Sequence, residues 1–365
     1  MPLLSELIVN SARAGLALQR PNGSFPSGHN GPYRDPETPL RNTGHWLITM
    51  AYAARTSGDA QFLDSVQRAA DYMLSPEHRP HNATWLHRDK AGKDRCNGLI
   101  GPAWTIEALC AASDALKDDK YAALASEVLE LIPYDDSVGM WHSLDVDGTD
   151  LSFDPTFNHQ LWLAMSASLL TAYGDTDAEK QARRFLNTLN INLTVGVDGM
   201  IQHGIGWLAT KRPIRTPRQL ASFFYRLPER RARKRAGRNK AIGYHAFNTY
   251  AFAVLQTQLP DHPAWNSQKI KEITSFVTSN TYRTEIETSD YGYPYNPPGF
   301  EIALTIEKLP LQLETIDHQI SGWIQSQIDR CLNETTHLMD QEATDPNTQT
   351  ARLYEATRLS DIELM

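Results

Sequence analysis

The sequence predicts an all-α protein whose helical hairpins close into an (α/α)6 toroid. Apolar helical segments centre on Trp46, Trp104 and Trp162, so that one pattern recurs twice at a spacing of 58 residues. Amphipathic segments with charged faces alternate with these apolar segments at about the same period. A repeat of this length with two helices builds either an open solenoid or a closed ring. Closure is favoured because neither end of the chain shows an obvious polar capping repeat.

Each repeat is expected to hold an inner helix, a short turn and an outer helix. The inner helices are the apolar, small-residue-rich segments around the three Trp residues, a fourth in which Tyr250 takes the Trp position, and a shorter fifth at 299–309. The outer helices carry apolar residues at i, i+3, i+4 and i+7, as in AQFLDSVQRAADYML, KYAALASEVLELI, DAEKQARRFLNTLN and NSQKIKEITSFVTS. A helix at about 4–19 starts the series. Asp and Gly in the turns TSGDAQF, LKDDKY and YGDTDAE supply breaks and N-caps, and only short strands are expected, in the long loops.

We expect a single toroid domain over 1–340 and a C-terminal tail or helix over 341–365. The step from Trp162 to Tyr250 is 88 residues, which places about 30 extra residues at 211–240. This insertion contains 12 Lys or Arg residues and one acid. It is interpreted either as a solvated surface loop or as an element that contacts an anionic membrane surface or a lipid-linked phosphate. Nucleic acid is a weaker alternative, because no nucleic-acid motif accompanies the charge.

The composition is that of an ordinary globular protein, with 41% hydrophobic residues, 21% charged residues and a net charge of −8. Cys96, Cys110 and Cys331 are scattered and odd in number, which indicates reduced thiols. The N-terminus is not a convincing signal peptide, and no run of 18 apolar residues exists to span a membrane. We therefore expect a cytoplasmic protein, with peripheral contact to the inner face of the membrane through 211–240 as a further hypothesis.

Polar chemistry is concentrated in the long loops that lead into the inner helices. The first of these, GSFPSGHNGPYRDPETPLRNTGHW, and its four counterparts all carry His, Asp, Tyr, Trp, Arg or Asn. In a closed ring the N-termini of the inner helices converge at one mouth, where their free N–H groups favour anions. The loops therefore predict a pocket, with flat aromatic surfaces for sugar rings and polar groups for hydroxyls.

Carboxylates near helix starts can act as general acid or base, and a Tyr can do so if a neighbour lowers its pKa. The predicted catalytic residues are Asp35, Asp154, Tyr244, His245 and Glu301. The predicted substrate-binding residues are His29, Tyr33, Glu37, Arg41, Asn42, His45, Trp46, Arg95, Trp104, Asn158, His159, Trp162, His203, Asn248, Tyr291, Tyr293 and Tyr295. The Arg residues available for a substrate carboxylate are Arg34, Arg41, Arg88 and Arg95.

Several alternatives to a role in catalysis stay open for these residues. Asp35 fits an ion-paired loop equally well, Asp154 also fits a simple N-cap before Pro155, and His45 also fits a satisfied core polar group. The chain has no GxGxxG, P-loop, HExxH, GxSxG or Cys/His zinc spacing. We therefore expect neither cofactor nor metal, and chemistry by acid and base groups alone.

Three segments carry a family resemblance. GHNGPYRDPETPLRNTGHWL, FDPTFNHQLW and GYPYNPPGFE resemble AglQ-type proteins encoded in archaeal N-glycosylation gene clusters, within the six-hairpin glycosidase-like superfamily. The resemblance runs from about 20 to 310, and the basic insertion has no match in the family pattern. It implies a role in assembling or remodelling a hexuronate-containing, lipid-linked glycan. It carries over no catalytic residues.

Three hypotheses remain open. The first is a glycosidase-like enzyme acting on a uronate-containing oligosaccharide, in which Asp35 or Asp154 is the acid or base and Arg41 binds the carboxylate. The second is a uronate C5-epimerase, in which Tyr or Glu groups exchange the C5 proton from opposite faces. The third is a non-catalytic glycan-binding scaffold of a glycosylation complex.

Overall fold

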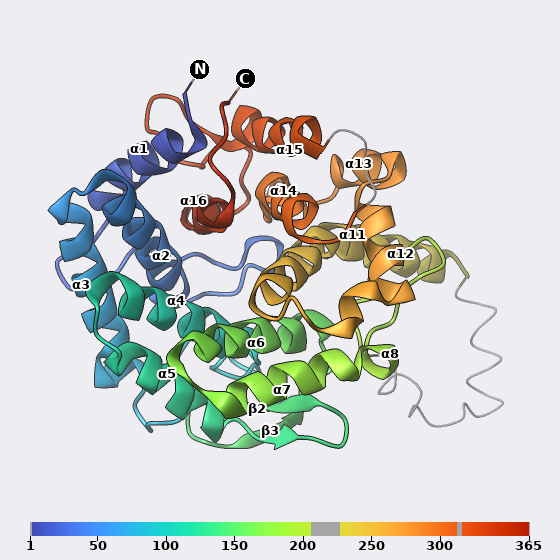
Figure 1. Cartoon of the computed structure of the whole chain (residues 1–365), viewed down its shortest axis with the longest axis horizontal. Helices are drawn as coiled ribbons and strands as arrows, with labels where there is room; N and C mark the ends of the chain where they lie inside the picture. Colours follow the sequence, from blue (N-terminus) through green and yellow to red (C-terminus); the bar gives the residue numbers. More distant parts are fainter. Residues whose placement is uncertain (1, 206–226, 312–315, 365) are drawn as a thin grey trace.

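The helices form two concentric rings (Figure 1), in a computed structural model that describes residues 2–205, 227–311 and 316–364. The inner ring comprises α2 (Leu40–Ser57), α4 (Ile100–Leu116), α6 (Phe157–Leu169), α11 (Leu227–Gln258), α14 (Pro298–Lys308) and the pair α16 (Pro346–Ala351) and η5 (Arg352–Arg358). The outer ring comprises α1 (Leu4–Leu16), α3 (Ala60–Leu74), α5 (Lys120–Leu131), α7 (Thr176–Asn187), the pair α12 (Gln268–Val277) and α13 (Asn280–Ile286), and α15 (Ile316–Cys331).

The inner ring is closed. Each of α2, α4, α6, α11 and α14 contacts the next, and η5 contacts both α14 and α2. The predicted all-α toroid is therefore confirmed, including the 58-residue register that places Trp46, Trp104 and Trp162 on α2, α4 and α6. No helix of the described residues is long and apolar enough to cross a membrane.

The C-terminal segment supplies the sixth inner position. It is helical over 346–358, lies between α14 and α2 and contacts both (Figure 1). The sequence patterns place residues 341–365 outside the toroid domain. In the structure, residues 346–358 lie within the inner ring. The chain ends also meet, since the Leu4 amide donates to the Ile362 carbonyl at 2.9 Å and the Leu364 amide to the Pro2 carbonyl at 2.9 Å.

The remaining elements are small and belong to the loops. β1 (Tyr134–Asp135), β2 (Met140–Leu144) and β3 (Asp150–Phe153) form one antiparallel sheet before α6. The short helices are η1 (Gly31–Tyr33), η2 (Pro76–His78), η3 (Leu170–Tyr173), α8 (Leu189–Asn192) and η4 (Pro263–Asn266).

Caps and turns explain where the hairpins bend. The Asp59 carboxylate accepts from the Gln61 amide at 3.0 Å, and Asp175 accepts from the Asp177 and Ala178 amides, so both cap outer helices as predicted. Gly58 ends α2 at φ +71°, a conformation that costs glycine little. These short turns leave the long loops together at the N-terminal ends of the inner helices.

The three Trp residues occupy the same repeat position in different surroundings. Trp46 stacks on Phe25 with ring centroids 5.3 Å apart, and Trp162 stacks on Phe247 at 4.3 Å. Trp104 instead reaches a cavity at the mouth of the ring. The repeat therefore predicts burial at this position but does not distinguish core from site.

Candidate functional site

A cavity of about 180 Å³ lies at the N-terminal ends of the inner helices, among the long loops. Nine of the predicted residues line it: Tyr33, Asp35, Arg41, Trp104, Asn158, His159, His203, Tyr244 and Tyr295. They come from segments spread over 260 residues of sequence, and ring closure brings them together. The cavity is therefore the candidate site.

Asp154 lies directly behind the cavity and holds His159. Its Oδ2 lies 2.7 Å from His159 Nδ1, and its carboxylate accepts from the Thr156 and Leu99 amides at 2.9 and 3.2 Å. Burial opposes ionisation of Asp154, but His159 and these hydrogen bonds outweigh it and lower the pKa of the carboxyl. An ionised Asp154 accepts from Nδ1–H of His159, so in the neutral form of this ring, which lines the cavity, Nε2 carries the lone pair.

Asp35 lines the cavity but is held by two lysines. Both Lys90 and Lys93 form ion pairs with its carboxylate, one on each oxygen. Burial of Asp35 raises its pKa, and the two ammonium groups outweigh burial, so the pKa is lowered. The carboxyl stays ionised and engaged, which is the ion-paired alternative for this residue.

Two arginines that line the cavity form ion pairs with buried carboxylates. Arg41 forms an ion pair with Glu37 at 3.1 Å, and its guanidinium lies 4.1 Å from the Trp104 ring centroid. Arg352 pairs with Glu301 and Glu355, each at 2.7 Å. Glu301 therefore contacts a residue that lines the cavity, Arg352, but does not line the cavity itself. Its predicted catalytic role has no direct geometric support.

Tyr33 and Tyr244 share a hydrogen bond, with their hydroxyl oxygens 3.0 Å apart. Burial, reinforced by Tyr295, raises the pKa of both phenols. The prediction that a neighbour lowers a Tyr pKa therefore finds no support here, and both hydroxyls keep their protons. Tyr295 donates to Asn30 Oδ1 at 2.7 Å, while Tyr291 packs against Tyr33 and Tyr244 without lining the cavity.

His203 and Asn158 present unused polar atoms. Burial and the nearby Lys240 lower the pKa of His203 to about 3, so its ring is neutral near pH 7. Asn158 is 3% exposed, and its Oδ1 has no hydrogen-bond partner among the described residues. A buried amide oxygen at a cavity wall is a ready acceptor for a ligand hydroxyl.

The remaining predicted residues do not line the cavity. His245 is fully buried, where its Nδ1 accepts from the Ile201 amide at 3.2 Å and its Nε2 donates to the Ile273 carbonyl at 3.1 Å. His45 stacks on Tyr354 at 4.3 Å between ring centroids, in the core. The others outside the cavity lining are His29, Glu37, Asn42, Trp46, Arg95, Asp154, Trp162, Asn248, Tyr291, Tyr293 and Glu301.

The cavity also has residues that the sequence analysis did not assign to the site: Asn30, Lys93, Asn97, Ile100, Thr156, Lys240, Phe247, Asn296 and Arg352, together with Arg88, which it named only as an available cation. Arg352 belongs to the segment placed outside the toroid, and Lys240 is the last residue of the basic insertion. Neither position carries a local motif. A closed ring with six inner positions was the signal that could have found Arg352.

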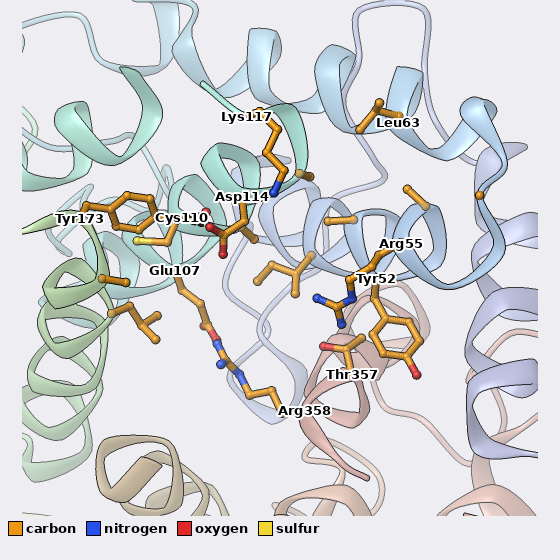
Figure 2. Close-up of a pocket in the computed structure, with 18 of the residues that line it drawn as sticks. Tyr52, Arg55, Leu63, Glu107, Cys110, Asp114, Lys117, Tyr173, Thr357 and Arg358 are labelled. Carbon is orange, nitrogen blue, oxygen red and sulfur yellow. Dashed lines mark hydrogen bonds and ion pairs between the residues drawn. The ribbon is translucent and has the colours of Figure 1, made fainter. Parts of the chain in front are cut away.

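A second, larger cavity of about 750 Å³ lies at the C-terminal ends of the inner helices (Figure 2). Glu107 and Arg358 pair across its floor at 2.6 Å, and Tyr52, Arg55, Asp114 and Lys117 border it. None of the predicted site residues lines this cavity. At its border the Asp114 carboxylate accepts from the Tyr173 hydroxyl at 2.8 Å.

Solved structures define the class of fold. The chain matches an inactive variant of the α-1,6-mannanase GH76A of Salegentibacter sp. HEL1_6 in complex with α-1,6-mannotetrose, at 12% identity and a TM-score of 0.63 over 97% of this chain and 98% of that one. It matches cellobiose 2-epimerase from Spirochaeta thermophila DSM 6192 at 13% identity and a TM-score of 0.64, over 97% and 96% of the two chains. These matches show that the chain shares the closed toroid of helical hairpins with both proteins.

Sequence similarity then identifies the family. No protein-family model matches the chain. It is 39% identical, over 100% of its own length and 99% of the other, to Archaeal glycosylation protein Q of Haloferax volcanii. The chain belongs to the family of that glycosylation protein, which confirms the resemblance seen in its motifs.

Proposed function

We propose that this protein is a carbohydrate-active enzyme that epimerises a uronate residue of a glycan by proton transfer at C5. One observation carries the proposal: the Asp154–His159 pair lies at a cavity whose other walls hold five cationic side chains, Arg41, Arg88, Lys93, Lys240 and Arg352. An anionic sugar suits these walls, and the pair supplies a base. The family's place in glycosylation and the sugar-active neighbours support a glycan substrate.

The chemistry follows from the hydrogen bonds. His159 Nε2 accepts the C5 proton, and the electron pair moves into the carboxylate to form an enediolate. Of the surrounding cations, the three arginines have carboxylate partners, so Lys93 and Lys240 chiefly stabilise the charge that develops there. Tyr244, which keeps its proton in the resting site, donates that proton to C5 from the other face and becomes a phenolate. Tyr33 then donates to it and takes a proton from water, and His159 releases the abstracted proton to water, so that the cycle closes.

The geometry favours this epimerase over a glycosidase. Hydrolysis of a glycosidic bond normally uses two carboxyl groups flanking the bond. Among the described residues the cavity has one carboxyl, Asp35, and both its oxygens are engaged by lysines. Residues 206–226 contain no Asp, Glu or His, so they cannot supply the second.

The test is incubation with a defined uronate oligosaccharide in heavy water, followed by mass spectrometry and NMR. The wild type is expected to incorporate deuterium at C5 without releasing sugar. His159→Gln is expected to lower the exchange rate by about 10²- to 10⁴-fold, the usual range for a lost general base.

His142→Gln is the matched control, because His142 also pairs through Nδ1 with an aspartate, Asp150, at 2.8 Å but lies on the surface sheet. Its exchange rate is expected to equal that of the wild type. Release of a reducing end without exchange would replace the proposal by the glycosidase hypothesis. If the wild type shows neither deuterium exchange nor sugar release, the scaffold hypothesis is the one that remains.

A further inference from the structure

The cations of the cavity are not equally engaged. Arg41 pairs with Glu37, Arg88 pairs with Asp94, and Arg352 pairs with Glu301 and Glu355. These carboxylates neutralise the arginines and leave little attraction for a second anion. Arg41 is predicted from the sequence to bind the substrate carboxylate, but the Glu37 carboxylate already occupies its guanidinium.

The lysines differ. Lys93 shares the single carboxylate of Asp35 with Lys90, so these three groups carry one excess positive charge. Lys240 has no carboxylate partner among the described residues. Its ammonium lies 5.1 Å from the ring centroid of Tyr33 and 5.6 Å from that of Tyr244. The uncompensated charge of the cavity is therefore concentrated at Lys93 and Lys240.

The two ammonium groups repel one another within one small space. Burial, and then the charge of Lys93, lowers the pKa of Lys240. Two like charges that face one cavity without an anion between them repel each other, and an anion that enters relieves the repulsion. Both side chains also line the cavity that holds His159.

We propose that Lys93 and Lys240 form the anion site of this cavity and bind the carboxylate of a uronate ring, thereby setting specificity for an acidic over a neutral sugar. The inference rests on the proposed function and deepens it. The cavity of about 180 Å³ has the room of roughly six water molecules. That room suits a single sugar ring with a carboxylate attached directly to it.

Lys240 is held in place from both directions along the chain. Two residues earlier, Arg238 pairs with Glu285 and Asp198, each at 2.7 Å, and Asn239 donates to Asp290 at 3.0 Å. Four residues later, Tyr244 lies one turn along the same helix face. The end of the basic insertion is thereby anchored, and its last lysine is directed to the site.

The test compares equilibrium binding of three probes by ligand-observed NMR: glucuronic acid, glucose and glucose 6-phosphate. The wild type is expected to bind glucuronic acid at least tenfold more tightly than glucose. Lys240→Met and Lys93→Met are each expected to weaken glucuronic acid binding by about 10- to 100-fold, because a charge-assisted hydrogen bond is lost. Glucose binding is expected to stay within twofold, and Lys240→Arg to retain part of the preference.

Lys120→Met is the control, because it removes the same charge from the outer helix α5, where Lys120 pairs with Asp118. Unchanged selectivity in both cavity variants would overturn the proposal, and so would an equal loss for glucuronic acid and glucose. Tighter binding of glucose 6-phosphate than of glucuronic acid would replace the carboxylate by a phosphate and overturn the assignment to uronate. Selective, lysine-dependent binding without deuterium exchange would support the anion site while removing the proposed epimerase chemistry.

Discussion

Asp154 Oδ2 and His159 Nδ1 lie 2.7 Å apart, five residues apart in the chain and on either side of the start of α6. The carboxylate also accepts two backbone amides, from Thr156 and Leu99. One carboxylate therefore holds the residue that precedes α6, ties the start of α4 to the start of α6 and orients an imidazole. The N-cap of α6 is Thr156, and no side chain caps it, so the N-cap interpretation of Asp154 is wrong.

Asp154→Asn is expected to lower deuterium exchange by about 10²-fold or more, because the amide no longer stabilises the charged imidazole or specifies its tautomer. Stability is also expected to fall by about 1–3 kcal/mol as the carboxylate's bonds to buried amides are lost. Exchange rates and urea unfolding measure the two effects. Asp150→Asn on the surface pair is the control, and equal activity in the two variants would contradict the role of Asp154.

Gly98→Ala tests the space around the same pair. Gly98 has φ +59°, and a Cβ there would lie 2.5 Å from Asp154 Oδ2 and 2.8 Å from His159 Nδ1. The variant is expected to lose exchange activity more than tenfold. Gly92→Ala is the matched control in the same loop, with φ +78° and no atom within 4 Å of the added Cβ. Its alanine has the same left-handed backbone cost, about 1–2 kcal/mol, and the variant should remain active.

Arg352→Met is expected to destabilise the protein by about 3–5 kcal/mol, because it leaves two buried carboxylates without their counter-ion. Burial raises the pKa of Glu355 to about 7 even with Arg352 present. Urea unfolding at pH 8 measures the loss. Arg183→Met, which breaks partly exposed pairs with Glu179 and Asp261, should change stability by less than about 1 kcal/mol. Equal losses would refute the structural role of Arg352.

His87 predicts a specific pH dependence. Burial, with Arg41 and Arg88 nearby, lowers its pKa to about 3, whereas an unfolded His titrates near 6.5. The unfolded state therefore binds the extra proton, so this residue's contribution is complete above about pH 6.5 and is lost as pH falls toward 3. Relative to His87→Gln, the wild type is expected to lose about 2 kcal/mol between pH 7.5 and 5. Parallel pH profiles of the two proteins would contradict this.

Membrane contact through the basic insertion at 211–240 stays a prediction. Residues 211–226 lie outside the described residues, whereas Arg238 and Lys240 have structural and cavity contacts. The deletion that tests membrane contact is therefore 211–226, which removes five Lys and Arg residues. It is expected to weaken sedimentation with anionic liposomes at low salt while leaving neutral liposomes unaffected. Unchanged sedimentation would reject the contact.

Local sequence patterns predicted the helices well because the burial of one helix face and the capping of helix ends depend on residues close together in the chain. The spacing of apolar residues on α3 and α7 follows from which face of a helix is buried, and Asp59 and Asp175 cap those helices through amides two or three residues away. The same reasoning could not separate Trp104 from Trp46 and Trp162. Their identical places in the repeat predict burial, and only neighbouring rings decide which one reaches the cavity.

The sequence by itself determined the period of the repeat, the inner and outer faces, the loops that carry polar chemistry and the family. Only the tertiary structure decided which polar groups are free to act. Asp35 and Arg41 have ion-pair partners, His245 is buried with hydrogen bonds to Ile201 and to Ile273 of α12, and Lys240 has no carboxylate partner among the described residues. The physical reason is that helix formation depends on neighbours a few residues away, whereas charge compensation depends on residues such as Arg352 and Lys240, which reach the site only when the ring closes.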